Sequence, residues 1–445
     1  MDTLYISLNH YNLPWLMMST ANADKNRWLI AVSAVAIHLS IGSIYAYSIY
    51  QIPLNETLGW ETGSVTLAFS IAILVLGFTA AFLGKYVEKY GPRAAALSAA
   101  VLYGIGMVGS GLSVQLGILP LFLATFGVIG GMGLGIGYIS PIGTLVEWFP
   151  DRRGMATGLA VMGFGAGALL TGPLGNYLIQ NFSVAMAFYA LGALYFVLMS
   201  LGASYLEKPP DGWLPEGMQD EEDAQEKAES ALPGLDNLTA VEARTTARFW
   251  MVWLIIFINV SAGIMLLAFA SPMLQQIAGA TASTAAFITG YIGIFNGGGR
   301  IFWASLSDYI GRTTTYGAFF GIQIVAFLAM PQLAGVWILA ATMFLVITCY
   351  GGGFACLPAY LSDLFGTKEV SAIHGYSLTA WGIAGVAGPQ LASFILESTG
   401  NYTNALYVMN GALVVGLITV LVLRWRIGKL QDTSSLDTGA AATTD

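Results

Sequence analysis

The chain has 445 residues, of which 56% are apolar and only 9% are Asp, Glu, Lys or Arg. A soluble domain carries roughly 25% charged residues, so this composition excludes a water-soluble globule. The net charge of −8 is local, because residues 207–247 hold 11 acids against Lys208, Lys227 and Arg244. With no basic face elsewhere, nucleic-acid binding is excluded as well.

Apolar runs recur along the chain from Trp28 onward. Twelve bilayer spans of about 20 residues would use roughly 240 residues, which fits the length and predicts an all-α membrane protein. We predict the spans at 28–50, 63–83, 95–114, 117–140, 155–180, 184–206, 249–270, 285–306, 314–331, 335–360, 370–396 and 403–425. The predicted domains are a tail (1–27), a six-span half (28–206), an acidic linker (207–247), a second six-span half (248–425) and a C-terminal tail (426–445).

Basic residues gather on one side of the predicted membrane. Sixteen of the 17 Lys and Arg residues fall near the termini or in loops after even-numbered spans, and the loops on the other side contain none. By the positive-inside rule, both termini and the linker are predicted to be cytoplasmic. The chain is thus expected to cross the plasma or inner membrane many times. The seventeenth basic residue is Arg300.

The sequence repeats with a period of about 220 residues. The segment Gly84–Arg93 corresponds to Ala304–Arg312, and Gly165–Pro173 corresponds to Gly382–Pro389. One six-span unit is therefore used twice. Two similar halves with parallel topology place a site at mid-membrane between them.

These duplicated motifs resemble the major facilitator superfamily over residues 28–425. The resemblance implies the major facilitator fold, with twelve helices in two pseudo-symmetric six-helix halves, and function as a monomer. Within the superfamily, the segments Trp148–Gly154 and Asn296–Arg300 resemble the oxalate/formate antiporter family and the related monocarboxylate transporters. That resemblance implies that Arg300 holds a substrate carboxylate. Where the oxalate antiporter has a lysine in span eleven, this chain has Trp381, which favours a monocarboxylate.

Arg300 is predicted to lie deep in span eight, eight residues or about 12 Å before Asp308 along a helix. An arginine at such depth costs about 2.5–3.5 kcal/mol, and no Asp or Glu occurs in the middle of any predicted span. A guanidinium fork matches a carboxylate, so a small organic anion is the predicted counter-charge. The alternative is a structural Arg300 that bonds helix carbonyls or reaches toward the cytoplasmic face.

Other side chains are candidates for the same site. Asn296 lies one turn before Arg300 on the same face. Aromatic residues can exclude water and donate hydroxyl groups to an anion, and the predicted lining residues are Tyr45, Tyr138, Tyr350, Phe354 and Trp381. Histidines can titrate near neutral pH, so His374 and His38 are candidates for proton coupling, and His374 also for substrate contact. Packing between helices is the alternative for each.

Two charged pairs mark predicted cytoplasmic turns: Glu88 with Arg93, and Asp308 with Arg312. We predict that they hold one gating state, and solvated turns without an energetic role are the alternative. The sequence shows no ATP-binding loop and, inside the spans, no Ser/His/Asp, paired-carboxylate or His/Cys cluster. Neither an enzyme nor a nucleotide, metal or cofactor site is therefore predicted.

Together these features predict a secondary active transporter of small carboxylates such as oxalate, formate, lactate or pyruvate, working by alternating access. An empty site with an unpaired buried cation would return slowly, so exchange is the leading hypothesis. Proton-coupled symport of a monocarboxylate is the second. An anion sensor that signals through the linker, and a channel, are alternatives from other classes.

Overall fold

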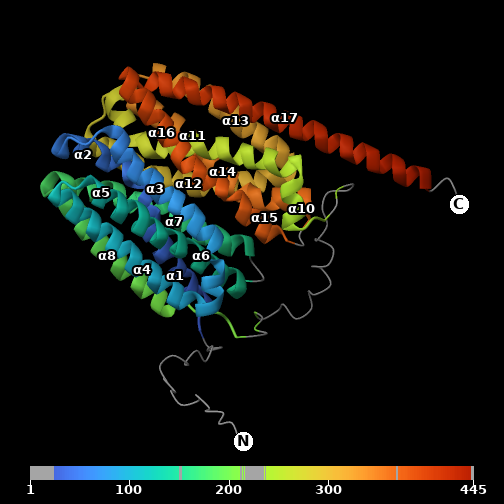
Figure 1. The fold of residues 1–445 in the computed structure, drawn as a ribbon, viewed down its shortest axis with the longest axis horizontal. Coiled ribbons are helices and arrows are strands. Elements are labelled where there is room, and N and C mark those ends of the chain that lie inside the picture. Colours follow the sequence, from blue (N-terminus) through green and yellow to red (C-terminus); the bar gives the residue numbers. More distant parts are fainter. Residues whose placement is uncertain are drawn as a thin grey trace, which may run out of the picture.

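The computed structural model describes residues 25–149, 153–210, 237–366 and 369–441, together with residues 213, 215 and 235. Most of the predicted N-terminal tail and of the linker lies outside these residues, and so does the Glu88 side chain. The described residues form helices joined by short turns, without a strand. Figure 1 shows them as one bundle, with α17 extending beyond it toward the C-terminus.

The first half supplies six long helical segments. The first segment runs through α1 (Arg27–Ile41), η1 (Gly42–Tyr50) and α2 (Gln51–Leu58), where η1 has 3-10 geometry. The next two are α3 (Thr62–Phe82) and α4 (Gly84–Leu116). The fourth joins α5 (Leu119–Phe122), η2 (Leu123–Gly130) and α6 (Gly131–Trp148), and the last two are α7 (Arg153–Asn181) and α8 (Val184–Tyr205).

The second half follows the short helix α10 (Ala240–Thr245). Its helices are α11 (Ala247–Ala278), α12 (Ala282–Ile310), α13 (Arg312–Ala329) with η5 (Met330–Gln332), α14 (Val336–Phe365), α15 (Val370–Ser377) with α16 (Thr379–Thr399), and α17 (Tyr402–Ala441). Each predicted span coincides with one of these segments. Several segments run further than predicted: the first continues to Leu58 and the fourth to Trp148.

Ten of the described segments are long and apolar enough to cross a membrane. The other two, α7 and α12, pack against each other across the boundary between the halves. Both are rich in glycine, and a Cβ atom at Gly293 of α12 would lie 2.0 Å from the Gly165 carbonyl oxygen of α7. Their small residues serve close helix contact between the halves.

The helix ends repeat with the predicted period. Gly91 and Gly311 have φ angles of +80° and +84°. Gly91 lies at a kink near the start of α4 and Gly311 lies between α12 and α13, so both follow the second segment of a half. Gly59 and Gly279 end the first segment of each half in the left-handed conformation, with φ of +66° and +68°. Glycine adopts such angles without a steric penalty. Because each pair is separated by 220 positions, the internal repeat extends to the backbone geometry of the turns.

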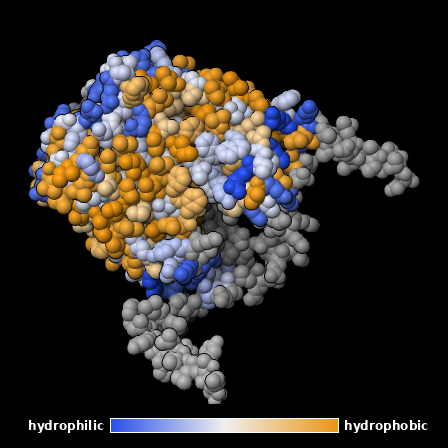
Figure 2. All heavy atoms as spheres, in the orientation of Figure 1, coloured by the Kyte–Doolittle hydropathy of each residue, from blue (hydrophilic) through white to orange (hydrophobic). Residues whose placement is uncertain are grey.

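The two halves meet along α7 with α12 and along α3 with α16. Their helices converge toward the end that holds α2 and α5 and diverge toward the end where the linker joins α8 to α10 (Figure 1). We call these the far end and the linker end. Figure 2 shows a broad hydrophobic band across the molecule, with hydrophilic residues gathered toward both ends. Such a band is the surface that a bilayer covers.

Hydrogen bonds between the halves follow this geometry. Within the described part of the chain they join residues at mid-depth or toward the far end: Tyr45–Tyr350, Ser48–Ser271, Gly63–Glu397, Ser70–Gln390 and Asn176–Ser283. The halves are therefore fastened to each other on the side away from the linker.

Candidate functional site

Arg300 lies on α12 with 7% of its surface exposed. Its Nε atom donates a hydrogen bond to Asn296 Oδ1 at 3.2 Å, one turn earlier on the same helix. Among the ion pairs of the described residues, none includes Arg300. The guanidinium is thus buried without an acidic partner in this part of the chain.

Glycines let α14 approach this residue closely. A Cβ atom at Gly351 would lie 2.4 Å from the Asn296 carbonyl oxygen and 3.2 Å from Arg300 Cγ. Of the three glycines between Asn296 and Arg300, Gly299 lies against Thr348 of α14, whereas a Cβ at Gly298 would meet nothing within 4 Å. The glycines in both helices therefore serve close packing at mid-membrane.

Polar side chains from α11 and α13 hold α14 in this position. Asn259 is fully buried and donates to the Cys349 carbonyl oxygen at 3.4 Å, while it accepts a bond from Gln323 at 2.6 Å. The Tyr316 hydroxyl donates to the Gly353 carbonyl oxygen at 2.6 Å. These bonds anchor α14 just before and at the end of its glycine triplet, residues 351–353. The neighbouring helices are so close there that larger side chains would not fit.

Six aromatic side chains form a closed circuit beside Arg300, which we call the aromatic collar. Neighbouring ring centroids are 4.9–6.1 Å apart and meet at steep angles, the edge-to-face geometry that aromatic pairs favour. The members are, in order, Tyr45, Phe164, Tyr138, Trp381, Phe354 and Tyr350. Each half contributes three of them, so the collar closes only when the halves are together.

The collar contacts Arg300 directly. The guanidinium carbon lies 5.3 Å from the centroid of the Phe354 ring, within cation–π range. The Tyr45 and Tyr350 hydroxyl groups are hydrogen-bonded to each other at 3.0 Å across the boundary between the halves. All five aromatic residues singled out from the sequence are thus brought together with Arg300.

Two buried N–H groups at this place have no hydrogen-bond acceptor: Asn296 Nδ2 and Trp381 Nε1. The Asn296 amide cannot be flipped, because Arg300 Nε is a donor and requires the amide oxygen on its side. Leaving a buried donor unsatisfied costs about 1–3 kcal/mol. The site thus holds one cation without an acidic partner and two N–H donors without an acceptor. A negatively charged hydrogen-bond acceptor would complement these groups.

The two histidines lie differently. His38 on α1 is fully buried behind the collar, with its ring 5.9 Å from Tyr138 and 6.4 Å from Phe164, and its Nε2 atom is 3.2 Å from the Tyr138 carbonyl oxygen. His374 lies on α15, seven residues before Trp381. Within the described residues, no hydrogen bond or ring contact joins His374 to the collar. Their roles in proton coupling and substrate contact stay predictions.

The predicted gating charges lie at the linker end, and their ion pairs stay within one half. Arg93 is paired with Glu207 at 3.0 Å, and Lys25 contacts the same carboxylate. Arg312 pairs with Asp308 and lies 3.9 Å from Asp363. In this conformation the pairs brace helix ends inside each half, and a gating role stays a prediction.

Sequence reasoning did not single out Phe164 or Glu207. Phe164 precedes Gly165 at the start of the repeated glycine motif in span five, a place where the motif brings α7 close to other helices. Glu207 is the first residue of the predicted linker, and Trp148 Nε1 donates to its carbonyl oxygen at 2.6 Å. Its position among many linker acids gave no signal that it would be paired.

Comparisons with known proteins agree with this architecture. The Major Facilitator Superfamily profile matches residues 31–389 and 252–440. The oxalate:formate antiporter of Oxalobacter formigenes is 29% identical over 384 residues, covering 84% of this chain and 86% of that protein. Monocarboxylate transporter 14 of Mus musculus is 22% identical over 461 residues, covering 89% of each. The crystal structure of a D-xylose-proton symporter superposes with a TM-score of 0.69 at 17% identity, over 89% of this chain and 97% of that one, which shows a shared fold.

Proposed function

This chain belongs to the Major Facilitator Superfamily and is a multi-pass membrane transporter, not an enzyme, and from that premise we propose that it carries small carboxylates bound at Arg300. The oxalate:formate antiporter and the monocarboxylate transporters among its relatives support an anionic cargo. Family membership also favours transport over the sensor alternative.

The observation that carries this proposal is the surplus of donors inside the membrane. Arg300 has no acidic partner among the described residues, and Asn296 Nδ2 and Trp381 Nε1 have no acceptor. A carboxylate supplies one negative charge and about four acceptor positions. It can take the guanidinium in bidentate fashion and accept a bond from one of the spare N–H groups.

The site favours a monoanion with a short carbon chain. One guanidinium neutralises one carboxylate, and Trp381 places an apolar ring where a second cation would be needed for a dianion. The remaining collar rings exclude water and contact a small apolar body. Formate, lactate and pyruvate therefore fit better than oxalate.

Exchange is the transport mode that we propose. For the halves to switch access, the site must pass through a closed state without water. An unpaired arginine there costs about 2.5–3.5 kcal/mol, which corresponds to a rate about 100-fold slower. A carrier loaded with carboxylate avoids this cost, so the loaded carrier switches faster than the empty one.

Proton-coupled symport is the second candidate, because His38 is buried against two collar rings. A proton carried there or at His374 offers another way to balance charge during the return step. Replacing each histidine with Gln, under an imposed pH gradient, separates the two modes. Under exchange, uptake is independent of the gradient in wild type and in both variants. Under symport, the gradient drives uptake in wild type and fails to do so when the coupling histidine is replaced.

The direct test is counterflow of labelled formate, lactate, pyruvate and oxalate in proteoliposomes. We expect uptake into vesicles preloaded with a carboxylate to exceed uptake into empty vesicles about 100-fold, following the cost of the unpaired arginine. Arg300→Gln should abolish uptake. Arg426→Gln, which removes the same charge from an exposed position on α17, should not. Unchanged uptake by Arg300→Gln would reject the assigned role.

A further inference from the structure

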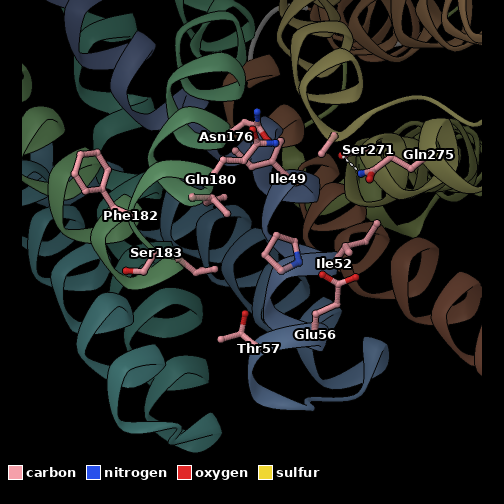
Figure 3. Close-up of a pocket in the computed structure, with 14 residues that line it drawn as sticks. Ile49, Ile52, Glu56, Thr57, Asn176, Gln180, Phe182, Ser183, Ser271 and Gln275 are labelled. Carbon is pink, nitrogen blue, oxygen red and sulfur yellow. Dashed lines mark hydrogen bonds between the residues drawn. The ribbon is translucent and has the colours of Figure 1, made fainter.

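A pocket lies at the far end of the molecule, away from Arg300. Its volume is about 500 Å³, within the range of about 300–1,000 Å³ typical of small-molecule sites. The walls come from η1, α2, α7 and the start of α8 in the first half, and from α11 and the start of α12 in the second. Figure 3 shows Glu56 and Gln275 on one side of the pocket and Phe182 on the other.

Each amide group of this pocket donates one of its two N–H groups to a neighbouring side chain. Gln275 Nε2 donates to Ser271 Oγ at 3.1 Å, which Figure 3 marks. Gln180 Nε2 donates to Asn176 Oδ1 at 3.2 Å, and Asn176 Nδ2 donates to Ser283 Oγ at 3.4 Å. Among the described residues, no hydrogen bond ends on the Gln275 or Gln180 amide oxygen, so both oxygens can accept from a ligand donor.

The charge of the pocket is negative. Glu56 lines it and is exposed, and within the described residues it takes part in no ion pair. The loops on this side of the predicted membrane contain no Lys or Arg. A carboxylate substrate is repelled here, so the pocket has the opposite polarity to the Arg300 site.

The remaining wall combines apolar side chains with the hydroxyl groups of Thr57, Ser183 and Ser271. Ile49, Ile52, Ile179 and Val184 line the pocket, and Phe182 stands at its edge with 64% of its surface exposed. An occupant therefore needs an apolar body as well as a charged donor. An aromatic or branched hydrocarbon attached to an amine meets both requirements.

We propose that this pocket binds a small monocationic amine with an apolar body and that the bound amine inhibits transport. Its ammonium group pairs with Glu56 and donates to the Gln180 and Gln275 carbonyl oxygens, while its hydrocarbon part contacts the isoleucines and Phe182. Because both halves form the walls, the pocket opens apart when the far end opens. An occupant stabilises the conformation that it fits and slows the switch to the other.

The test uses 3-phenylpropylamine as the probe and 3-phenylpropanol as its uncharged counterpart, on the purified full chain. We expect the amine to raise the thermal unfolding temperature in a saturable way and the alcohol to leave it unchanged at the same concentration. Glu56→Gln should weaken amine binding about tenfold, the loss of one hydrogen-bonded charge. Glu61→Gln, which removes a carboxylate from the same end outside the pocket, should not.

Two further outcomes decide the proposal independently of the transported substrate. Arg300→Gln should bind the amine as wild type does, and loss of binding there would place the amine in the central site and overturn the proposal. Equal effects of Glu56→Gln and Glu61→Gln would also overturn it, since they would indicate a general surface effect. Where counterflow is measurable, external amine should lower its maximal rate without changing the apparent affinity for carboxylate.

Discussion

Replacing Asn296 with Asp would supply within the chain the counter-charge that Arg300 lacks. Asn296 Oδ1 lies 3.2 Å from Arg300 Nε, so a carboxylate oxygen in its place would be at ion-pair distance. Two unit charges at that distance attract by about 5 kcal/mol at an effective dielectric constant of ~20. This exceeds the cost of about 2.5–3.5 kcal/mol for a lone arginine in the membrane interior.

A substrate would then compete with a tethered carboxylate. If half of the attraction remains after desolvation of the new charge, about 2.5 kcal/mol, the apparent affinity for substrate falls about 70-fold. Counterflow over a range of substrate concentrations measures this loss. The thermal unfolding temperature of the empty protein in detergent should be unchanged or higher, because the buried cation has gained a partner.

Asn259→Asp is the matched control. Asn259 is also fully buried in the second half, but its hydrogen-bond partners are Gln323 and a backbone carbonyl. A buried charge without compensation costs about 3–5 kcal/mol, so this variant should unfold at a clearly lower temperature. Wild-type affinity in Asn296→Asp, or a loss of stability equal to that of Asn259→Asp, would refute an unpaired Arg300 as the anion site.

Three more predictions follow from the same geometry. Arg300→Gln should not lower the unfolding temperature, because it removes a charge that costs about 2.5–3.5 kcal/mol. This offsets the loss of one hydrogen bond of about 1 kcal/mol and of a cation–π contact of about 1–2 kcal/mol; a clear fall in a thermal scan would support a structural role. Gly351→Ala should lower stability by about 1–3 kcal/mol and should also reduce counterflow, because its Cβ would lie 2.4 Å from the Asn296 carbonyl oxygen. Gly298→Ala should leave stability and counterflow intact, because nothing lies within 4 Å of its Cβ position. Phe354→Leu should lower the free energy of unfolding by about 1–2 kcal/mol through loss of the cation–π contact, while Phe354→Tyr should keep it; equal unfolding temperatures in the two variants would contradict that contact.

Much of the fold could be predicted from local sequence patterns. Runs of about 20 apolar residues predict spans because the bilayer requires each span to satisfy its own backbone hydrogen bonds. The repeat of about 220 residues predicted two equivalent halves, and the matching φ angles at Gly91 and Gly311 follow from it. Arg300 was recognisable because a cation inside an apolar run is costly wherever the helix packs.

Local sequence patterns did not predict the contacts between distant segments. The collar joins residues from five segments, and the place of Phe164 beside the repeated glycine motif did not mark it as a member. The pairing of Arg93 with Glu207 depends on where the linker leaves α8. The sequence instead suggested Glu88 as the partner of Arg93, and the Glu88 side chain lies outside the described residues. The spare donors on Asn296 and Trp381 became apparent only once every neighbour had a position.

By itself, then, the sequence determined that the chain spans a membrane in two related halves and carries one cation where charge is costly, since hydropathy and repetition are properties of contiguous residues. Tertiary structure alone decided which side chains surround that cation, which of their hydrogen-bonding groups are left over, and that a pocket of opposite polarity lies at the far end. These depend on how separate helices approach one another, and that approach is set by packing across the whole bundle.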